Sequence, residues 1–256
     1  MIKHQYVNVK ILSPALSVIT LNRPEKRNAL NMGLVEELGI VFESLRNNPS
    51  QRVAIINGEG PVFCSGLDLQ EAANPELADK SGELLAQILK SVYATPLITI
   101  CAVHGAVLAG GVGLMSVCDL VLASQGTRFG LPETRRGLVA ALVAVFLRRQ
   151  LGDRHLRELL LLGESIDAEQ ALRIGLINQV VAADNLLDEA VKYAALILKG
   201  APMATRETKQ LLSALDPVDI LEDINTAKAI HHKARSSLEA LEGARAFLEK
   251  RPPSWG

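Results

Sequence analysis

Residues 97–133 read LITICAVHGAVLAGGVGLMSVCDLVLASQGTRFGLPE. The stretch holds two apolar runs, LITICAVHG and DLVLAS, with the glycine cluster AGGVG between them. The first run predicts a buried strand closed by His104-Gly105, and the glycines open a segment of helical character at residues 114–118. Backbone N–H groups at such a turn lack helical partners, so they can stabilise negative charge that develops on a substrate oxygen. The alternative is that the cluster only forms a tight turn between strand and helix.

A second glycine turn precedes this stretch. Residues 53–56 predict a short strand, and the run VFCSGLDL at 62–69 predicts a further strand that ends in a turn at Gly66. Residues 84–93 predict the helix that leads to the strand beginning at Leu97. The order strand, glycine turn, helix therefore occurs twice, which is typical of an α/β domain with crossover helices. Because both glycine turns follow strands, we expect them to lie at one face of the domain. Each turn would then supply one N–H donor to the same site.

The regions on either side are simpler. At the N-terminus, apolar and polar residues alternate around Ser13-Pro14, which predicts a strand hairpin, and Asn28 is a candidate N-cap for the next helix. The C-terminal half is mostly helical, and residues 202–248 predict long helix with a charged surface. Such a region either packs on a neighbouring subunit or folds back on its own domain. Within it, His231 and His232 are expected to face solvent.

Composition excludes several classes of partner. The chain has 256 residues, of which 48% are hydrophobic, and a formal net charge of -1. It can therefore form a sizeable core, and it has no basic excess that would attract nucleic acid or an anionic membrane. No run predicts a membrane span or an export signal. The three cysteines lie in apolar runs, which favours reduced thiols in a cytoplasmic protein, and a small-molecule substrate is the simplest expectation.

Motifs for cofactors and nucleophiles are incomplete. The glycine cluster starts like a dinucleotide fingerprint, but Ser116 stands where the third glycine belongs, and the lysine of a phosphate loop is missing. No set of His, Cys or carboxylate residues has the spacing of a metal site. Cys64 is flanked by apolar residues, so we expect an inert core thiol rather than a nucleophile. His104 is either a base or a residue that hydrogen-bonds a turn.

Several motifs share their order and spacing with one enzyme family. They are LNRPEKRNALN (21–31), FCSGLDL (63–69), HGAVLAGGVGL (104–114), CDLVLAS (118–124), RFGLPETRRGL (128–138), GLIN (175–178) and AFLEKRPPSW (246–255). Each motif alone is weakly specific, but their joint order is highly specific and covers nearly the whole chain. In this combination the chain resembles the crotonase, or enoyl-CoA hydratase/isomerase, superfamily.

The resemblance implies an α/β fold, with a crotonase-like ββα spiral core and a C-terminal helical trimerisation region. Residues 1–195 would form the acyl-CoA-binding catalytic domain, and residues 196–256 the helical oligomerisation region of a homotrimer or a dimer of trimers. The substrate would be an acyl-CoA thioester. Coenzyme A is then part of the substrate, so no separate cofactor is expected, and neither nucleic acid nor a membrane is an implied partner.

The catalytic residues implied by the resemblance agree with the two glycine turns. The family's oxyanion hole falls on the backbone N–H groups of Leu67 and Gly110. Glu133 matches one of two glutamates that the hydratases of this family use, and Gly113 stands at the position of the other. Two glutamates can activate water for addition to a double bond, whereas one can still move a proton between carbons. Enoyl-CoA isomerisation is therefore favoured; hydration, acyl-CoA decarboxylation and acyl-CoA binding without catalysis are the alternatives.

Five further residues are expected at coenzyme A by similarity. Lys26 and Asn28 would lie near the adenine and phosphates, and Asp68 near the pantetheine. Phe247 and Lys250 would approach from the C-terminal helix, of the same chain or of a neighbouring subunit. The stretch at 140–145 lacks the proline and paired glycines of the usual hydratase loop, so the acyl chain length stays open.

Overall fold

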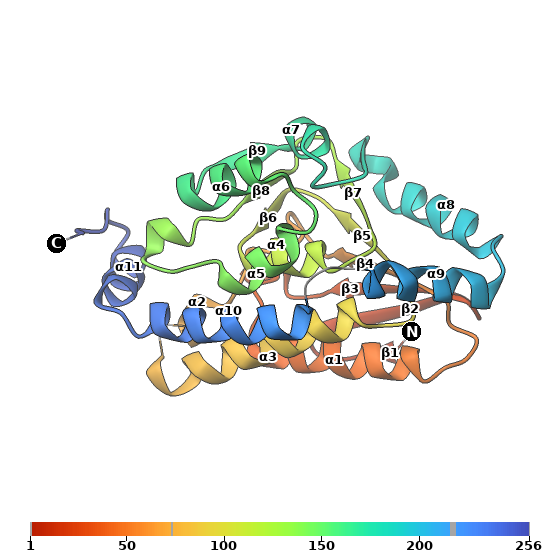
Figure 1. The fold of residues 1–256 in the computed structure, drawn as a ribbon, viewed down its shortest axis with the longest axis horizontal. Coiled ribbons are helices and arrows are strands. Elements are labelled where there is room, and N and C mark those ends of the chain that lie inside the picture. Colours follow the sequence, from red (N-terminus) through yellow and green to blue (C-terminus); the bar gives the residue numbers. More distant parts are fainter. Residues whose placement is uncertain (1, 73, 216–218, 256) are drawn as a thin grey trace.

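The computed structural model describes residues 2–72, 74–215 and 219–255. A seven-stranded sheet in the order β1-β2-β3-β4-β5-β7-β10 and a three-stranded sheet in the order β6-β8-β9 form its centre (Figure 1). The strands are β1 (Ile2–Lys3), β2 (Val7–Ser13), β3 (Leu16–Leu21), β4 (Val53–Gly58), β5 (Ile98–Val103), β6 (Ala106–Leu108), β7 (Leu120–Ser124), β8 (Arg128–Gly130), β9 (Ser165–Asp167) and β10 (Gln179–Val181). The predicted α/β class is confirmed.

The large sheet begins as the predicted hairpin and continues as parallel strands. β2 and β3 are antiparallel, with Val7 opposite Leu21, and β3, β4, β5, β7 and β10 then pair in parallel. Most residues of the central strands are buried, as in a sheet covered on both faces. Because β4 and β5 are parallel neighbours, their carboxyl ends lie side by side. The segments that leave these ends carry Gly66 and Gly110.

Helices cover both faces of the large sheet. They are α1 (Met32–Arg46), α2 (Leu69–Ala72), α3 (Pro75–Tyr93), α4 (Gly110–Ser116), α5 (Ala141–Leu147), α6 (Asp153–Leu162), α7 (Ala168–Arg173), α8 (Leu186–Leu198), α9 (Pro202–Ala214), α10 (Ile220–Arg235) and α11 (Leu238–Leu248), with the short 3-10 turns η1 (Pro24–Lys26), η2 (Thr134–Arg136) and η3 (Ala183–Asn185). α8 packs over Val53, Ile55 and Ile100, and α1 and α3 belong to the main core on the other face. In the part of the chain that the structure describes, no helix has both the length and the apolar composition needed to cross a membrane.

Residues 62–69 form an irregular segment, so the strand predicted there is wrong. Its β pairing is limited to isolated single-residue bridges at Cys64 and at Leu67, and further backbone hydrogen bonds, such as Phe63 N–H to the His104 carbonyl at 2.9 Å, hold it in place. The extended run is interrupted at Gly66, which has a φ of +97° and therefore a conformation that residues with a side chain rarely adopt. The turn brings the following backbone against the start of α4.

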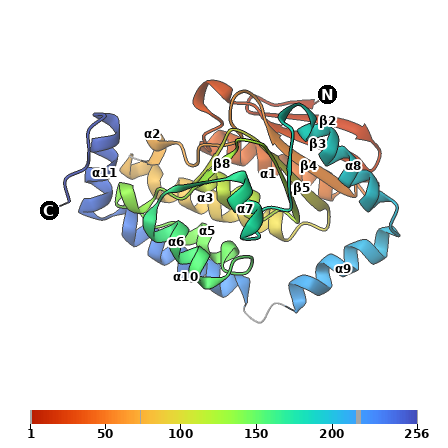
Figure 2. The ribbon, with the colours of Figure 1, turned by 90° about the horizontal axis from the view of Figure 1, so that it is seen from above.

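The C-terminal region forms three helices instead of the long helix predicted for residues 202–248. α10 packs against α3 and α5, and α11 packs against η2, so both fold back on the body of their own chain. α9 has no fully buried side chain and lies at the edge of the molecule (Figure 2), where Lys209 Nζ donates to the Leu97 carbonyl at 2.8 Å and to Asp119 Oδ2 at 2.7 Å. Its exposed apolar residues are Met203, Leu211 and Leu212. The division at residue 195 and the oligomerising role of residues 196–256 stay predictions.

Candidate active site

The two glycine turns meet, as the sequence predicts. A Cβ placed on Gly110, the first residue of α4, would lie 3.6 Å from the Leu67 nitrogen, and one placed on Gly66 would lie 3.3 Å from the Gly110 nitrogen. Within the described residues, neither the Leu67 N–H nor the Gly110 N–H donates a hydrogen bond. Both residues line one cavity. Two backbone donors without partners therefore face the same space, where they can bind an oxyanion.

Backbone hydrogen bonds fix both donors. The N–H and the carbonyl of Leu30 pair with the residues on either side of Leu67, at 2.8 and 3.1 Å. The Ala109 N–H donates to the Gly130 carbonyl at 2.9 Å. Ala109 also has a φ of 50°, which is strained for a residue with a side chain. The backbone frame thus sets the positions of the donors, and the strain is located beside Gly110.

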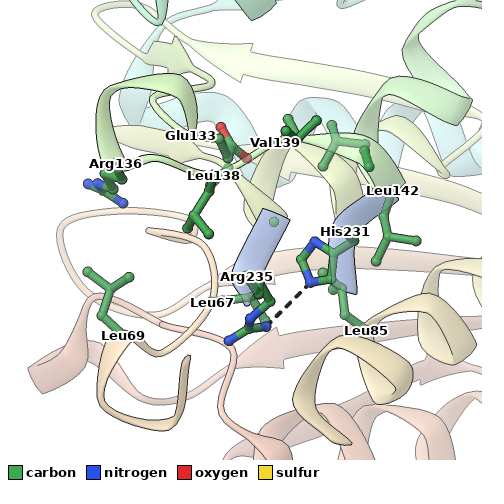
Figure 3. A pocket seen from close by; sticks show the side chains of 15 residues that line it. Leu67, Leu69, Leu85, Glu133, Arg136, Leu138, Val139, Leu142, His231 and Arg235 are labelled. Carbon is green, nitrogen blue, oxygen red and sulfur yellow. Dashed lines mark hydrogen bonds between the residues drawn. The ribbon is translucent and has the colours of Figure 1, made fainter. Parts of the chain in front are cut away.

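Glu133 carries the only carboxylate among the described residues that line the cavity (Figure 3). It directly precedes η2, and its Oε2 is buried without a hydrogen-bond partner among those residues. Burial raises the pKa of Glu133 to about 7, although the nearby charge of Arg136 opposes the shift. A carboxyl group with this pKa is populated in both protonation states near neutral pH. It can therefore both take and return a proton.

The cavity is small and mainly apolar. Its volume of about 60 Å³ corresponds to roughly four to six water molecules. Most of its wall consists of the side chains of Leu67, Leu69, Leu85, Leu138, Val139, Ala140, Ala141, Leu142 and Val143. An apolar wall limits the access of water and strengthens electrostatic interactions inside the site.

Gly113 faces an apolar part of the structure. A Cβ at this position would lie 3.1 Å from Val143 Cγ2 and 3.5 Å from Leu89 Cδ1. Both side chains are buried, and Val143 lines the cavity. Gly113 matches the position of the second glutamate in the hydratases that this chain resembles. In this chain the position is surrounded by apolar side chains.

The side chain of Asn28 has a structural role within its own loop. The side chain is fully buried: its Nδ2 donates to the carbonyls of Glu59 and Val62, both at 2.9 Å, and its Oδ1 accepts from the Arg23 N–H at 2.8 Å. Asn28 also does not cap α1, whose N-cap is Asn31. Its hydrogen-bonding groups are used inside the loop, so Asn28 shapes the loop, and its place near coenzyme A stays a prediction.

Asp68 and Lys26 differ in their surroundings. Asp68 is buried and accepts a hydrogen bond from Arg23 Nη1 at 2.6 Å. Burial by itself raises the pKa of Asp68, but hydrogen bonds from Arg23 and from the Gln70 N–H outweigh it, and the pKa lies below its ordinary value. Lys26 is exposed in η1. Of these two residues predicted to contact coenzyme A, only Lys26 has its charged group exposed to solvent.

Phe247 and Lys250 lie at the end of α11 and just beyond it, both exposed. The guanidinium of Arg136 lies 5.1 Å from the centroid of the Phe247 ring. α11 approaches η2 very closely, because a Cβ on Gly243 would collide with the Arg136 carbonyl. α11 therefore supports the turn that begins at Glu133 in the same chain.

Three polar residues that line the cavity were not among the predicted site residues: Arg136, His231 and Arg235. His231 and Arg235 lie one turn apart on α10 and point into the cavity region (Figure 3). The expectation that both histidines face solvent is right only for His232, which is exposed and pairs with Asp79 at 2.7 Å. The spacing of His231 and Arg235 was visible in the sequence, but the face of α10 that packs on the body was not.

Other candidate groups are structural. Cys64 is fully buried and burial raises its pKa to about 12, which confirms the predicted inert thiol. His104 Nε2 lies 2.8 Å from the Gly60 carbonyl, so it hydrogen-bonds a turn. Among the described residues, no group of three or more His, Cys, Asp or Glu side chains could hold a metal ion.

Comparisons with known proteins identify the family. Residues 13–256 match the enoyl-CoA hydratase/isomerase family, and the chain belongs to it. The chain is 35% identical over 254 residues to the mevalonyl-coenzyme A hydratase of Aspergillus fumigatus, covering 96% of this chain and 93% of that protein. It is 35% identical over 244 residues to the carnitinyl-CoA dehydratase of Proteus mirabilis, covering 93% of each. An enoyl-CoA hydratase structure from Mycobacterium avium subsp. paratuberculosis K-10 matches with a TM-score of 0.89 at 26% identity over 98% of each chain. The crotonase-like fold is thereby confirmed.

Proposed function

We propose that this enzyme isomerises the double bond of a short enoyl-CoA, with Glu133 as the acid–base. Ionised Glu133 takes a proton from the carbon next to the thioester carbonyl, and the electron pair moves onto the thioester oxygen. The N–H groups of Leu67 and Gly110 stabilise the resulting enolate. Protonated Glu133 then returns the proton to the far carbon of the former double bond. The observation that supports this most directly is that Glu133 carries the one carboxyl group among the described residues lining the cavity that both donors face, with its Oε2 buried.

The expected rate contributions agree with these roles for the two N–H donors and for Glu133. One donor of an oxyanion hole contributes on the order of 100- to 1,000-fold in rate. A positioned general acid–base contributes on the order of 100- to 10,000-fold, most effectively when its pKa lies near the working pH. The pKa of Glu133, about 7, meets that condition at neutral pH.

Isomerisation is favoured over hydration by what lies beside Gly113. Addition of water needs a group that holds and activates the water molecule, and a pair of glutamates can do so. Here the second position offers no carboxylate, and its neighbours Val143 and Leu89 are apolar. Glu133 can move a proton between two carbons without a second polar group.

Hydration is the second candidate, because two relatives at 35% identity are named as a hydratase and a dehydratase. The same donors would serve both reactions, since both proceed through a negative thioester oxygen. In hydration Glu133 would act on a water molecule instead of on a second carbon.

The two reactions are separated by their products in D2O. The purified enzyme is incubated with a 3-enoyl-CoA and, separately, with a trans-2-enoyl-CoA, and the products are followed by mass spectrometry. We expect migration of the double bond in the 3-enoyl-CoA and no hydrated product from the 2-enoyl-CoA. A hydrated product would establish hydration and overturn isomerisation as the main reaction. If neither substrate changes, the proposed enolate chemistry on enoyl-CoA is wrong.

A double variant tests the role of the wall beside Gly113. Gly113→Glu combined with Val143→Ala supplies a carboxylate and the room for it. We expect this variant to hydrate the trans-2-enoyl-CoA faster than Val143→Ala alone, which is the matched control. Equal hydration by the two variants would show that the second carboxylate does not decide the reaction.

Further contacts with coenzyme A and between subunits extend the proposal. Lys26 and Lys250 are exposed cations suited to its phosphates, Phe247 would pack on the ligand, and Asp68 would lie near the pantetheine. The exposed apolar side chains of α9 would form the subunit interface of a homotrimer or a dimer of trimers. Light scattering after size-exclusion chromatography tests the assembly, and a monomer would contradict it.

A further inference from the structure

Part of the cavity wall carries a positive charge. Arg235 and His231 reach it from α10, the helix that closes the cavity against α3 (Figure 3). α3 leaves room for them at Gly82, where a Cβ would lie 3.0 Å from the imidazole of His231 and 3.8 Å from Arg235 Nη1. A glycine at this point of α3 thus permits a close approach of the pair.

Fixed hydrogen bonds orient the guanidinium of Arg235. Its Nη1 donates to His231 Nε2 and to Ser81 Oγ, each at 3.3 Å. Burial and the charge of Arg235 lower the pKa of His231 to about 4, and His231 hydrogen-bonds the Val139 carbonyl. His231 is therefore neutral near neutral pH and accepts from Arg235. The pair carries one positive charge, held in place by α3 and by the loop before α5.

The charges of the cavity are unequal. Two arginines, Arg136 and Arg235, line it together with one carboxyl group, that of Glu133. Asp79, which is exposed and pairs with His232, attracts Arg235 from outside the cavity lining, and Arg235 has further partners within the protein. A second arginine in a mainly apolar acyl cavity is unnecessary for a purely hydrocarbon chain, because burying a charge costs free energy.

We propose that Arg235 binds a carboxylate at the far end of the acyl group, so that the substrate is the CoA thioester of a short unsaturated dicarboxylic acid. This substrate class rests on the proposed function. A guanidinium presents five N–H donors in a planar fork, so it keeps structural partners and still binds a carboxylate. Arg235 lines the same small cavity as Leu67 and Gly110, so an acyl group held by their N–H groups shares that space with the guanidinium.

The test compares two substrates that differ only at the acyl terminus: 3-hexenoyl-CoA, ending in a methyl group, and 3-hexenedioyl-CoA, ending in a carboxylate. We expect the wild type to favour the second in kcat/KM by about 10- to 100-fold, since a charge-assisted hydrogen bond is worth on the order of 1.5–3 kcal/mol. Arg235→Met should lose that preference, chiefly through KM, and Arg235→Lys should keep part of it. The control Lys233→Met, which removes an exposed cation from α10, should keep it in full.

Binding of hexanoyl-CoA and adipyl-CoA, measured by calorimetry, separates this proposal from the proposed reaction. Neither thioester has a double bond, so tighter binding of adipyl-CoA, lost in Arg235→Met, would support the carboxylate site even if no isomerisation occurs. Equal affinity of the wild type for both thioesters would overturn the site. So would an equal loss of affinity for both in Arg235→Met and Arg235→Lys, because that result indicates a structural role.

Discussion

The two sides of the cavity are built in different ways. The oxyanion donors, Leu67 and Gly110, come from segments that leave neighbouring strands, and backbone hydrogen bonds fix them. The helical side consists of Glu133, which precedes the 3-10 turn η2 that α11 packs on, and of His231 and Arg235 on α10, which packs on α3 and α5. Changes on the donor side should therefore affect every substrate alike. Changes on the helical side should affect proton transfer and the choice of acyl group.

The largest expected effect is on the helical side. Glu133→Gln preserves shape but cannot exchange a proton, so kcat for the 3-enoyl-CoA should fall by about 1,000-fold while KM changes little. Glu239→Gln, on the exposed surface of α11, is the control and should be fully active. A loss smaller than about 10-fold would mean that Glu133 is not the acid–base. The enzyme would then use the donors for other chemistry, such as decarboxylation.

The donor side is tested by Gly66→Ala. The φ of +97° strains any side chain, and the new Cβ would lie 2.8 Å from the Cβ of Ala109, so the two donors would be pushed apart. We expect kcat/KM to fall by about 100-fold for all enoyl-CoA substrates, with a loss of about 1–3 kcal/mol in the free energy of unfolding. Urea unfolding and kinetics on two substrates measure both effects.

Gly39→Ala is the matched control for Gly66→Ala. Gly39 lies inside α1, and nothing lies within 4 Å of a Cβ placed there. The control should keep full activity and gain about 0.5–1 kcal/mol of stability. Full activity in Gly66→Ala as well would show that the glycine turn does not hold the donors.

A smaller effect on kcat is expected from a change in the packing of α11 on η2. In Gly243→Ala the new Cβ would collide with the Arg136 carbonyl and move α11 away from η2. Glu133 precedes that turn, so kcat should fall by about 10-fold, since small displacements of a catalytic group cost rate. Arg245→Ala, an exposed change on the same helix, should be neutral. Unchanged kcat in Gly243→Ala would show that α11 does not position Glu133.

The donor side of the cavity could be predicted from the sequence better than the helical side. The hairpin, the parallel strands and the meeting of Leu67 with Gly110 could be predicted, because turns next to strands leave local signals in glycine and in apolar periodicity. The irregular course of residues 62–69 could not, since its apolar residues resemble those of a strand and only the bend at Gly66 distinguishes it.

The helical side could be predicted only through Glu133. The position of His231 depends on its contact with Gly82, which is distant in sequence, and no local pattern encodes such a contact. The same holds for Asn28, whose buried amide bonds to carbonyls of Glu59 and Val62. A helix periodicity shows which residues share a face, but not which other element that face meets.

The smallest expected effect is a dependence of stability on pH that arises on the helical side alone. The pKa of Glu133 is raised from 4.5 to about 7 by burial, so the folded chain holds a proton that the unfolded chain has already released. Below pH 4.5 both states are protonated and Glu133 has no effect. Between pH 4.5 and about 7 the free energy of unfolding falls as pH rises, and above that range the effect is constant.

Glu133→Gln removes this dependence. The full shift corresponds to at most about 3 kcal/mol, and partial exposure of the side chain reduces the expected effect to about 1 kcal/mol. The variant should therefore be about 1 kcal/mol more stable than the wild type at pH 8 and equally stable at pH 4, as measured by urea unfolding at both values. Gly66→Ala, on the donor side, should lower stability by the same amount at both pH values. A difference between wild type and Glu133→Gln that does not change with pH would mean that the carboxyl group is not held in an apolar site.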